Sequence, residues 1–237
     1  MMSRFKRYLT ALRRYNRSRG FGIHSPFAFY FVRRVLRERC HYYAYEQLTK
    51  YRHVAHRLIA NRKAAKTIIS QSNARMLFRV TCYFAPSHVL QIGSTYGVST
   101  MAMLTVSNRS SLTIFTGSNT CNDVFSQVTA SESHRIKRFG CLDETLGNYD
   151  KLREVGGFVL INNIEEDEIE LLLPKIKTII EEGGVVVMRN LAKSIQMKHF
   201  WGKLNASISH GMTFSNYRIG IIVGLKHLPR QNYILWF

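Results

Sequence analysis

The segment 88–100, HVLQIGSTYGVST, constrains the fold of this 237-residue chain more than any other. Val89, Leu90 and Ile92 predict a short buried strand, which ends at Gly93. Gly97 follows four residues later, and the hydroxyl side chains after it fit the first turn of a helix. A glycine turn between a strand and a helix lets the backbone bend sharply and approach a ligand closely. The segment therefore indicates an α/β protein with a binding site at this turn.

The rest of the chain repeats the alternation of strand and helix. Further strands are predicted at 112–115, 135–138, 158–161, 185–188, 213–223 and 233–237. Helical patterns lie between them at 123–130, at 166–182 and around Phe200. Alternating strands and helices imply a doubly wound, mostly parallel sheet, here of seven strands, and the last two strands suit an antiparallel addition at its edge.

A basic, helical N-terminal extension precedes this unit. We place the extension at 1–73 and the α/β domain at 74–237, with helices expected over 3–17, from Pro26 to Arg39, over 45–60 and over 74–84. Ser25 is expected to cap the second helix, with Pro26 in its first turn. The net charge is +19, and about half of the 34 basic residues fall within the first 66 residues.

This charge distribution predicts an anionic partner for residues 1–66. Basic side chains alternate with tyrosines that could stack on bases, at Tyr42, Tyr43, Tyr45 and Tyr51, so a nucleic acid or another polyanion is one candidate. An anionic membrane surface is a second candidate. The third alternative is a helical cap whose polar face happens to be basic.

Several classes of protein are disfavoured by the sequence. No apolar run reaches the roughly 20 residues that a membrane span needs, and the charged N-terminal segment lacks the apolar core of a secretory signal. The four cysteines are widely spaced, which argues against a zinc site and a disulfide framework and favours reduced thiols in a cytoplasmic protein. No Ser/His/Asp or Cys/His triad has recognisable spacing.

The glycine spacing G-x-x-x-G-x-S-T differs from the dinucleotide fingerprint G-x-G-x-x-G. It resembles the first motif of class I S-adenosylmethionine-dependent methyltransferases, in their O-methyltransferase-like branch. The resemblance covers about 78–237, and GIHSPF at 22–27 is similar to the helical leader of a bacterial group of these proteins. It implies a Rossmann-like seven-stranded sheet whose last strand is antiparallel, with S-adenosylmethionine as cofactor and a methyl acceptor that the sequence does not identify.

The resemblance also assigns the cofactor site residue by residue. It places S-adenosylmethionine at the carboxyl ends of the first, second and fourth strands. The residues that would contact it are Gln91, Gly93, Ser94, Tyr96, Gly97, Ser99, Thr116, Gly117, Asn162 and Asn163.

Every acidic residue that the family places in this site is replaced. Gln91 and Thr116 stand where the first and second strands carry carboxylates, and Asn162 and Asn163 follow the fourth strand. Arg189 follows the fifth, where an acidic pair is usual, so we expect no metal site. Two hypotheses remain open: a methyltransferase with neutral ligand contacts, or a noncatalytic relative that keeps the fold and binds polyanions.

Other polar residues have structural explanations. His24, beside the Ser25 cap, is expected to pack or cap rather than act as a base, and His88 is expected at the surface. Asp143 and Glu144 suit a helix cap or loop. The acidic run 165–168 is expected to begin a helix, where carboxylates complement the helix dipole.

Overall fold

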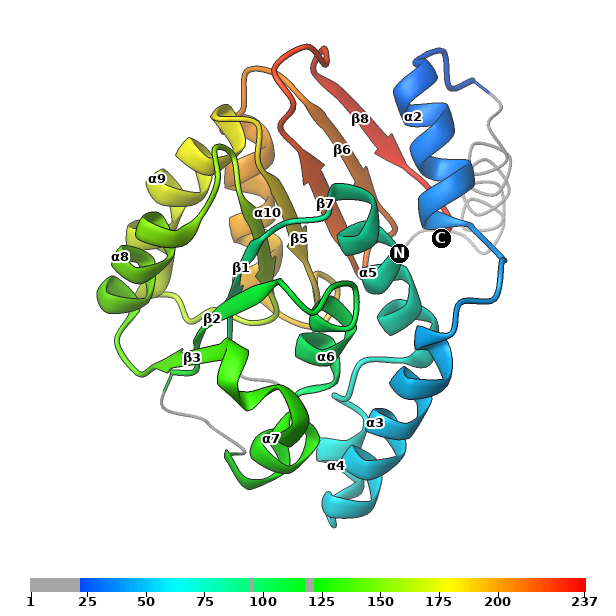
Figure 1. The fold of residues 1–237 in the computed structure, drawn as a ribbon. Coiled ribbons are helices and arrows are strands. Elements are labelled where there is room, and N and C mark those ends of the chain that lie inside the picture. Colours follow the sequence, from blue (N-terminus) through cyan, green and yellow to red (C-terminus); the bar gives the residue numbers. More distant parts are fainter. Residues whose placement is uncertain (1–21, 94–95, 118–121) are drawn as a thin grey trace, which may run out of the picture.

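The computed structural model describes residues 22–93, 96–117 and 122–237, and its centre is one twisted sheet (Figure 1). The strand order is β3-β2-β1-β4-β5-β7-β6-β8. The strands are β1 (His88–Ile92), β2 (Ser111–Phe115), β3 (Ile136–Phe139), β4 (Phe158–Ile161), β5 (Val185–Met188), β6 (Met212–Ser215), β7 (Gly220–Val223) and β8 (Gln231–Ile234). The first five strands pair in parallel, whereas β7 pairs antiparallel with both β5 and β6. The predicted doubly wound, mostly parallel α/β fold is confirmed.

The predicted count of seven strands is wrong, because the segment 213–223 forms two strands. A tight turn separates β6 from β7, with Tyr217 in the left-handed region at φ +66°. The Asn216 side-chain oxygen accepts hydrogen bonds from the backbone amides of Arg218 (3.1 Å) and Ile219 (2.9 Å). An asparagine that binds the backbone beyond it favours such a turn. The chain's last strand, β8, lies at the sheet edge parallel to β6, and the antiparallel strand inserted beside β5 is β7.

Helices lie at each predicted position that the structure describes, with small shifts of their ends, and further helices that were not predicted lie at 62–65, 130–135 and 142–152. The helices are α2 (Pro26–Tyr30), the π-helix η1 (Phe31–Leu36), α3 (Ala44–Leu58), α4 (Arg62–Ala65), α5 (Gln71–Phe84), α6 (Val98–Leu104), α7 (Asn122–Val128), the 3₁₀ helix η2 (Ala130–Arg135), α8 (Leu142–Leu152), α9 (Glu168–Glu181) and α10 (Ile195–Ser207). The helix predicted over 3–17 lies outside the described residues. No helix in the described part of the chain is long and apolar enough to span a membrane.

The helix that begins at Pro26 confirms the predicted cap but not the predicted length. The Ser25 hydroxyl accepts a hydrogen bond from the Ala28 amide (3.3 Å). After Tyr30 the α-helix widens into η1, which ends at Leu36 rather than at Arg39. The Arg79 guanidinium donates to the carbonyls of Val35 (2.6 Å) and Leu36 (2.8 Å), so a side chain of α5 satisfies the last carbonyl groups of η1.

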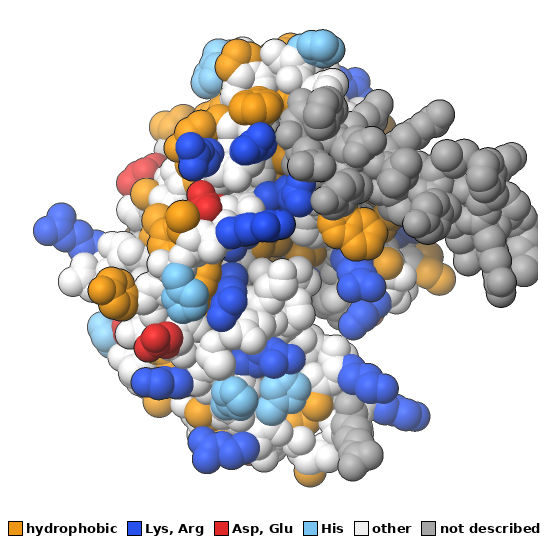
Figure 2. All heavy atoms as spheres, turned by 90° about the vertical axis from the view of Figure 1, so that its right-hand side faces the viewer, with side chains coloured by type: hydrophobic (Ala, Val, Ile, Leu, Met, Phe, Trp, Pro, Cys, Tyr) orange, Lys and Arg blue, Asp and Glu red, His pale blue; other side chains and the backbone are white. Residues whose placement is uncertain are grey.

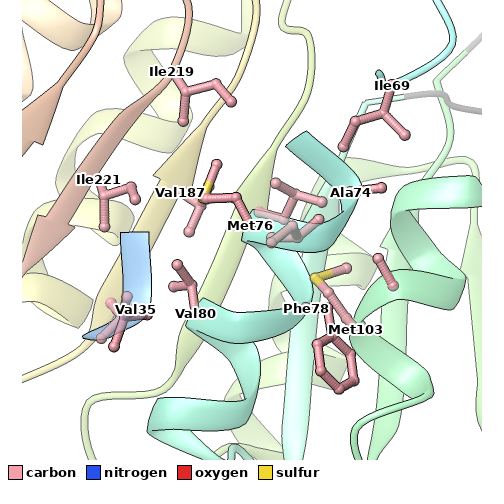
Figure 3. Packing of buried hydrophobic residues seen from close by; sticks show 14 of the residues in the cluster. Val35, Ile69, Ala74, Met76, Phe78, Val80, Met103, Val187, Ile219 and Ile221 are labelled. Atoms are coloured by element: carbon pink, nitrogen blue, oxygen red, sulfur yellow. The ribbon is translucent and has the colours of Figure 1, made fainter. Parts of the chain in front are cut away.

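Two apolar cores lie on opposite faces of the sheet. Helices α8, α9 and α10 cover one face, and α2, η1, α3, α5, α6 and α7 pack against the other (Figure 1). Figure 3 shows Met76 and Val80 of α5 in one buried cluster with Val35 of η1 and Val187 of β5. The helices before residue 73 therefore share a core with the sheet.

His88 is buried, so its predicted surface position is wrong. It is the first residue of β1 and is 4% exposed. Its ring nitrogens lie 2.6 Å from the Ser111 hydroxyl and 2.8 Å from the Thr113 hydroxyl of β2. Burial lowers the pKa of His88 from 6.5 to about 4, and the positive charge of Lys137 adds to this effect.

The acidic residues lie at the starts of helices, as predicted. Asp143 and Glu144 are exposed in the first turn of α8. Ahead of α9, the Glu165 amide donates to the Glu168 carboxylate (2.9 Å), which stabilises the start of that helix.

Candidate cofactor site

The residues after β1, β2 and β4 lie together at the carboxyl edge of the sheet. Ile92 pairs in register with Phe115 and with Ile161, so the next residue of each strand lies at the same level. The Gly93 amide donates to the Phe115 carbonyl (3.2 Å), and the Asn162 amide donates to the Ile92 carbonyl (2.8 Å). Parallel α/β sheets bind ligands at this edge.

Both glycines of the turn are required by packing. Gly93 has φ +90°, and a Cβ atom there would lie 2.7 Å from the Asn163 amide nitrogen and still closer to its carbonyl oxygen. Gly97 has φ +83°, and a Cβ atom there would lie 2.9 Å from the Thr129 methyl carbon. Close approach of the loop after β4 and of the end of α7 thus explains these glycines without a ligand. Gly117 differs, because it has φ +61° and, of the described residues, only the Phe115 ring would lie within 4 Å of an added Cβ atom.

The two residues that replace carboxylates at β1 and β2 bind neighbouring elements. Gln91 is fully buried, and its side-chain oxygen accepts a hydrogen bond from the Thr100 hydroxyl of α6 (2.8 Å). Thr116 is half-buried, and its hydroxyl donates to the Phe139 carbonyl at the end of β3 (3.2 Å). A hydroxyl that donates still has lone pairs with which to accept. Thr116 thus keeps some capacity to bind a ligand hydroxyl.

Two polar atoms in this region are buried and have no hydrogen-bond partner among the described residues. They are the Ser99 hydroxyl, in the first turn of α6, and the side-chain nitrogen of Asn162. An unsatisfied buried polar group costs about 1–3 kcal/mol, so such atoms are unusual unless something else binds them. Both residues belong to the predicted cofactor site.

A buried cation lies beside Asn162, at the end of β5. Arg189 is 7% exposed, and its guanidinium donates to the Asn162 side-chain oxygen (2.6 Å). Burial lowers the pKa of Arg189 to about 10, which leaves it charged at neutral pH. The next residue, Asn190, has φ +61° and donates from its side chain to the Asn162 carbonyl (2.9 Å). The ends of β4 and β5 are therefore joined by two side-chain contacts.

With the Arg189 guanidinium at the end of β5, the strand ends lack the oxygen ligands that a divalent metal needs. Across the described residues, no group of three or more His, Cys, Asp or Glu side chains could hold a metal ion. A guanidinium carries only donors and cannot ligate a cation. The neutral and cationic residues present thus do not fit a divalent metal.

The other residues predicted to contact the cofactor differ in their exposure. Asn163 is exposed, whereas Tyr96 is half-buried against the core. Ser94 lies outside the described residues. Sequence reasoning missed the Arg189–Asn162 pair, although one signal was present: both residues directly follow predicted strands, 158–161 and 185–188, that are consecutive along the chain.

Comparison with known proteins supports the fold. No protein-family model and no curated protein matches the chain. Three solved structures illustrate the similarity at the level of the fold. The methyltransferase PaMTH1 of Podospora anserina, with bound S-adenosylhomocysteine, has a TM-score of 0.56 at 12% identity and matches 75% of this chain and 87% of its own.

Two further structures are similar to the same extent. The Streptomyces achromogenes O-methyltransferase TomG, in complex with S-adenosylmethionine, has a TM-score of 0.55 at 15% identity and matches 75% of this chain and 89% of its own. An O-methyltransferase of Bacillus cereus, with S-adenosylhomocysteine, has a TM-score of 0.52 at 14% identity, with 78% and 92% matched. The chain therefore has the class I fold of S-adenosylmethionine-dependent O-methyltransferases.

Proposed function

We propose that this protein binds S-adenosylmethionine at the carboxyl edge of β1, β2 and β4 and transfers its methyl group to an acceptor. The observation that carries the proposal is the pair of unpartnered buried polar atoms, on Ser99 and Asn162. A ligand with carboxylate, amine and hydroxyl groups would satisfy both. Thr116 would face the ribose hydroxyls, and the Gly93 turn would border the methionine portion.

The chain's residues would act by binding and orientation. S-adenosylmethionine, when bound, supplies an electrophilic methyl group on a sulfonium. Alignment of two reactants contributes about 7–11 kcal/mol to lowering a barrier, so a site without a dedicated base can still promote transfer to a nucleophilic acceptor. Replacement of the ribose-binding carboxylate by Thr116 removes a charged hydrogen bond of about 1.5–3 kcal/mol. We therefore expect affinity about ten- to a hundredfold below that of a site with the acid.

Calorimetric titration with S-adenosylmethionine and S-adenosylhomocysteine tests the proposal. Thr116→Glu should tighten S-adenosylmethionine binding by about tenfold. Asn108→Glu is the matched control, because it adds the same charge at an exposed position before the opposite end of β2 and should leave affinity unchanged. Absence of binding by both the parent and Thr116→Glu would reject the proposal. Tight binding by the parent that Thr116→Glu weakens would instead support a neutral site of another design.

The noncatalytic alternative is supported by the surface charge of the N-terminal helices. Residues 22–66 carry only two acidic side chains, and their exposed basic side chains are Arg33, Arg34, Arg39, Lys50, Arg57, Lys63 and Lys66. Figure 2 shows Lys and Arg side chains following one another across this side of the molecule, with few Asp or Glu between them.

Base stacking by the tyrosines has less support than phosphate contacts. Tyr43 is 98% exposed, whereas Tyr45 is buried and accepts a hydrogen bond from Arg79 (2.9 Å). Tyr42 packs edge-on against Phe78, with ring centroids 5.6 Å apart. Polyanion binding through the basic N-terminal extension predicts affinity for RNA or DNA that falls steeply with salt, and deletion of residues 1–20 should flatten that dependence. Binding that ignores salt would leave the basic helices as a structural cap.

A further inference from the structure

A pocket of about 470 Å³ opens where the chain leaves β5, beside the loop that connects α4 to α5. Its size is within the range of small-molecule sites. Four basic side chains line it, and no acidic side chain does: Lys66 before α5, Arg189 and Lys193 after β5, and Arg218 in the turn before β7. Basic residues from three separate parts of the chain thus converge on one cavity.

Arg189 is the buried member of this set. Among the described residues, its guanidinium donates a hydrogen bond to the Asn162 oxygen, and no carboxylate of these residues lies within salt-bridge distance of it. The segments outside the described residues contain no Asp or Glu, so they cannot supply one either. Buried charges in proteins are ordinarily paired, because desolvation without an opposite charge is costly. A guanidinium also has five N–H donors in a fixed planar arrangement, which suits an oxyanion.

The start of α5 adds to the positive potential. Ser70 caps this 14-residue helix by accepting from the Asn73 amide (3.3 Å), and both residues line the pocket. The amino end of a helix carries a partial positive charge and unpaired amides. The pocket therefore combines a buried arginine, three exposed cations and a helix terminus, all of one sign.

We propose that this pocket binds the phosphate group of a phosphorylated small molecule. A phosphate ester carries close to two negative charges at neutral pH and three acceptor oxygens, and it would pair the Arg189 fork with the surrounding lysines. A single carboxylate would leave most of the four cations unmatched. The inference does not depend on S-adenosylmethionine binding, because none of the four cations is among the residues assigned to that cofactor.

Inorganic phosphate and pyrophosphate are the probes, and the full chain is used at constant ionic strength set with chloride. Thermal unfolding and calorimetry should show stabilisation and binding at low millimolar phosphate, tighter for pyrophosphate, and absent with acetate. Sulfate and phosphate also stabilise proteins generally by exclusion from their surfaces. Specific binding is therefore judged from the difference between the parent and the variants.

Arg189→Met should weaken phosphate binding at least tenfold. Arg189→Met also leaves the Asn162 side-chain oxygen without its donor, so the readout for this variant is phosphate affinity and not the unfolding temperature. Arg109→Met is the matched control, because it removes one exposed positive charge before the opposite end of β2 and should leave phosphate binding unchanged.

Substitutions of two exposed residues that line the pocket provide a second test, in case Arg189→Met fails to fold. Lys193→Met and Arg218→Met should each weaken phosphate binding about threefold or more without loss of structure. Absence of phosphate binding by the parent, or equal binding by the parent and the lining variants, would overturn the proposal. An equal loss in Arg109→Met would also overturn it, because the effect would then follow net charge alone.

Discussion

The burial of His88 makes the stability of this protein depend on pH in a defined window. In the folded chain the neutral imidazole lies between two hydroxyls of β2, and its pKa is about 4, against 6.5 ordinarily. Between these values the unfolded chain binds a proton that the folded chain does not. Stability is therefore fully present above pH 6.5 and is lost as pH falls toward 4. A pKa difference of one unit corresponds to about 1.36 kcal/mol, so the stability lost through His88 is about 3 kcal/mol. This is a large part of the free energy of unfolding of a typical protein, which is about 5–15 kcal/mol.

Urea unfolding at several pH values between 7.5 and 4 measures this contribution. His88→Gln keeps a polar side chain but cannot titrate, so its free energy of unfolding should fall by about 3 kcal/mol less than that of the parent over the window. The exposed His227→Gln is the matched control and should follow the parent. Parallel pH profiles for the parent and His88→Gln would refute the reasoning, because His88 would then titrate alike in the folded and unfolded chains.

Three further substitutions test packing and capping through the free energy of unfolding in urea. Gly157→Ala should cost about 2–3 kcal/mol, because Gly157 has φ +75° and a Cβ atom there would collide with the Tyr149 hydroxyl, and a cost below 1 kcal/mol would contradict this. Phe31→Ala should cost about 3–5 kcal/mol, since the ring is fully buried in the core, and an unchanged midpoint would refute that packing. Ser194→Ala should cost about 1 kcal/mol by removing the cap that accepts from the Met197 amide (3.1 Å), and a neutral result would show that water replaces it.

Local patterns predicted most of the fold, and they failed where tertiary contacts decide. The strand-turn-helix around Gly93 and the Ser25 cap follow from short-range chemistry and are confirmed. The division of 213–223 into two strands depends on Asn216 binding the backbone beyond it, which an apolar run conceals. The burial of His88 could not be predicted from the residues around it in the sequence either, because its two hydroxyl partners come from β2.

The candidate site was predictable in position and less so in chemistry. Strand ends fixed which residues share an edge, so the approach of Gly93 to Asn162 was expected. Arg189 drew attention only as a replaced acid, and the sequence could not show that it is buried or that it contacts Asn162. Burial depends on the loops that cover a strand end, and their course is not encoded in local periodicity.

The contact between Phe31 and Phe214 has a consequence for how the chain reaches its native state. Their ring centroids lie 5.0 Å apart, although 182 residues separate them in the sequence. During synthesis the helices near Phe31 emerge long before β6, the strand that carries Phe214, so the part of their apolar surface that faces β6 stays uncovered until late. Contacts that distant in sequence slow folding and leave apolar surface exposed meanwhile. Until the ribosome completes the last strands, this exposed apolar surface makes the unfinished chain prone to aggregate.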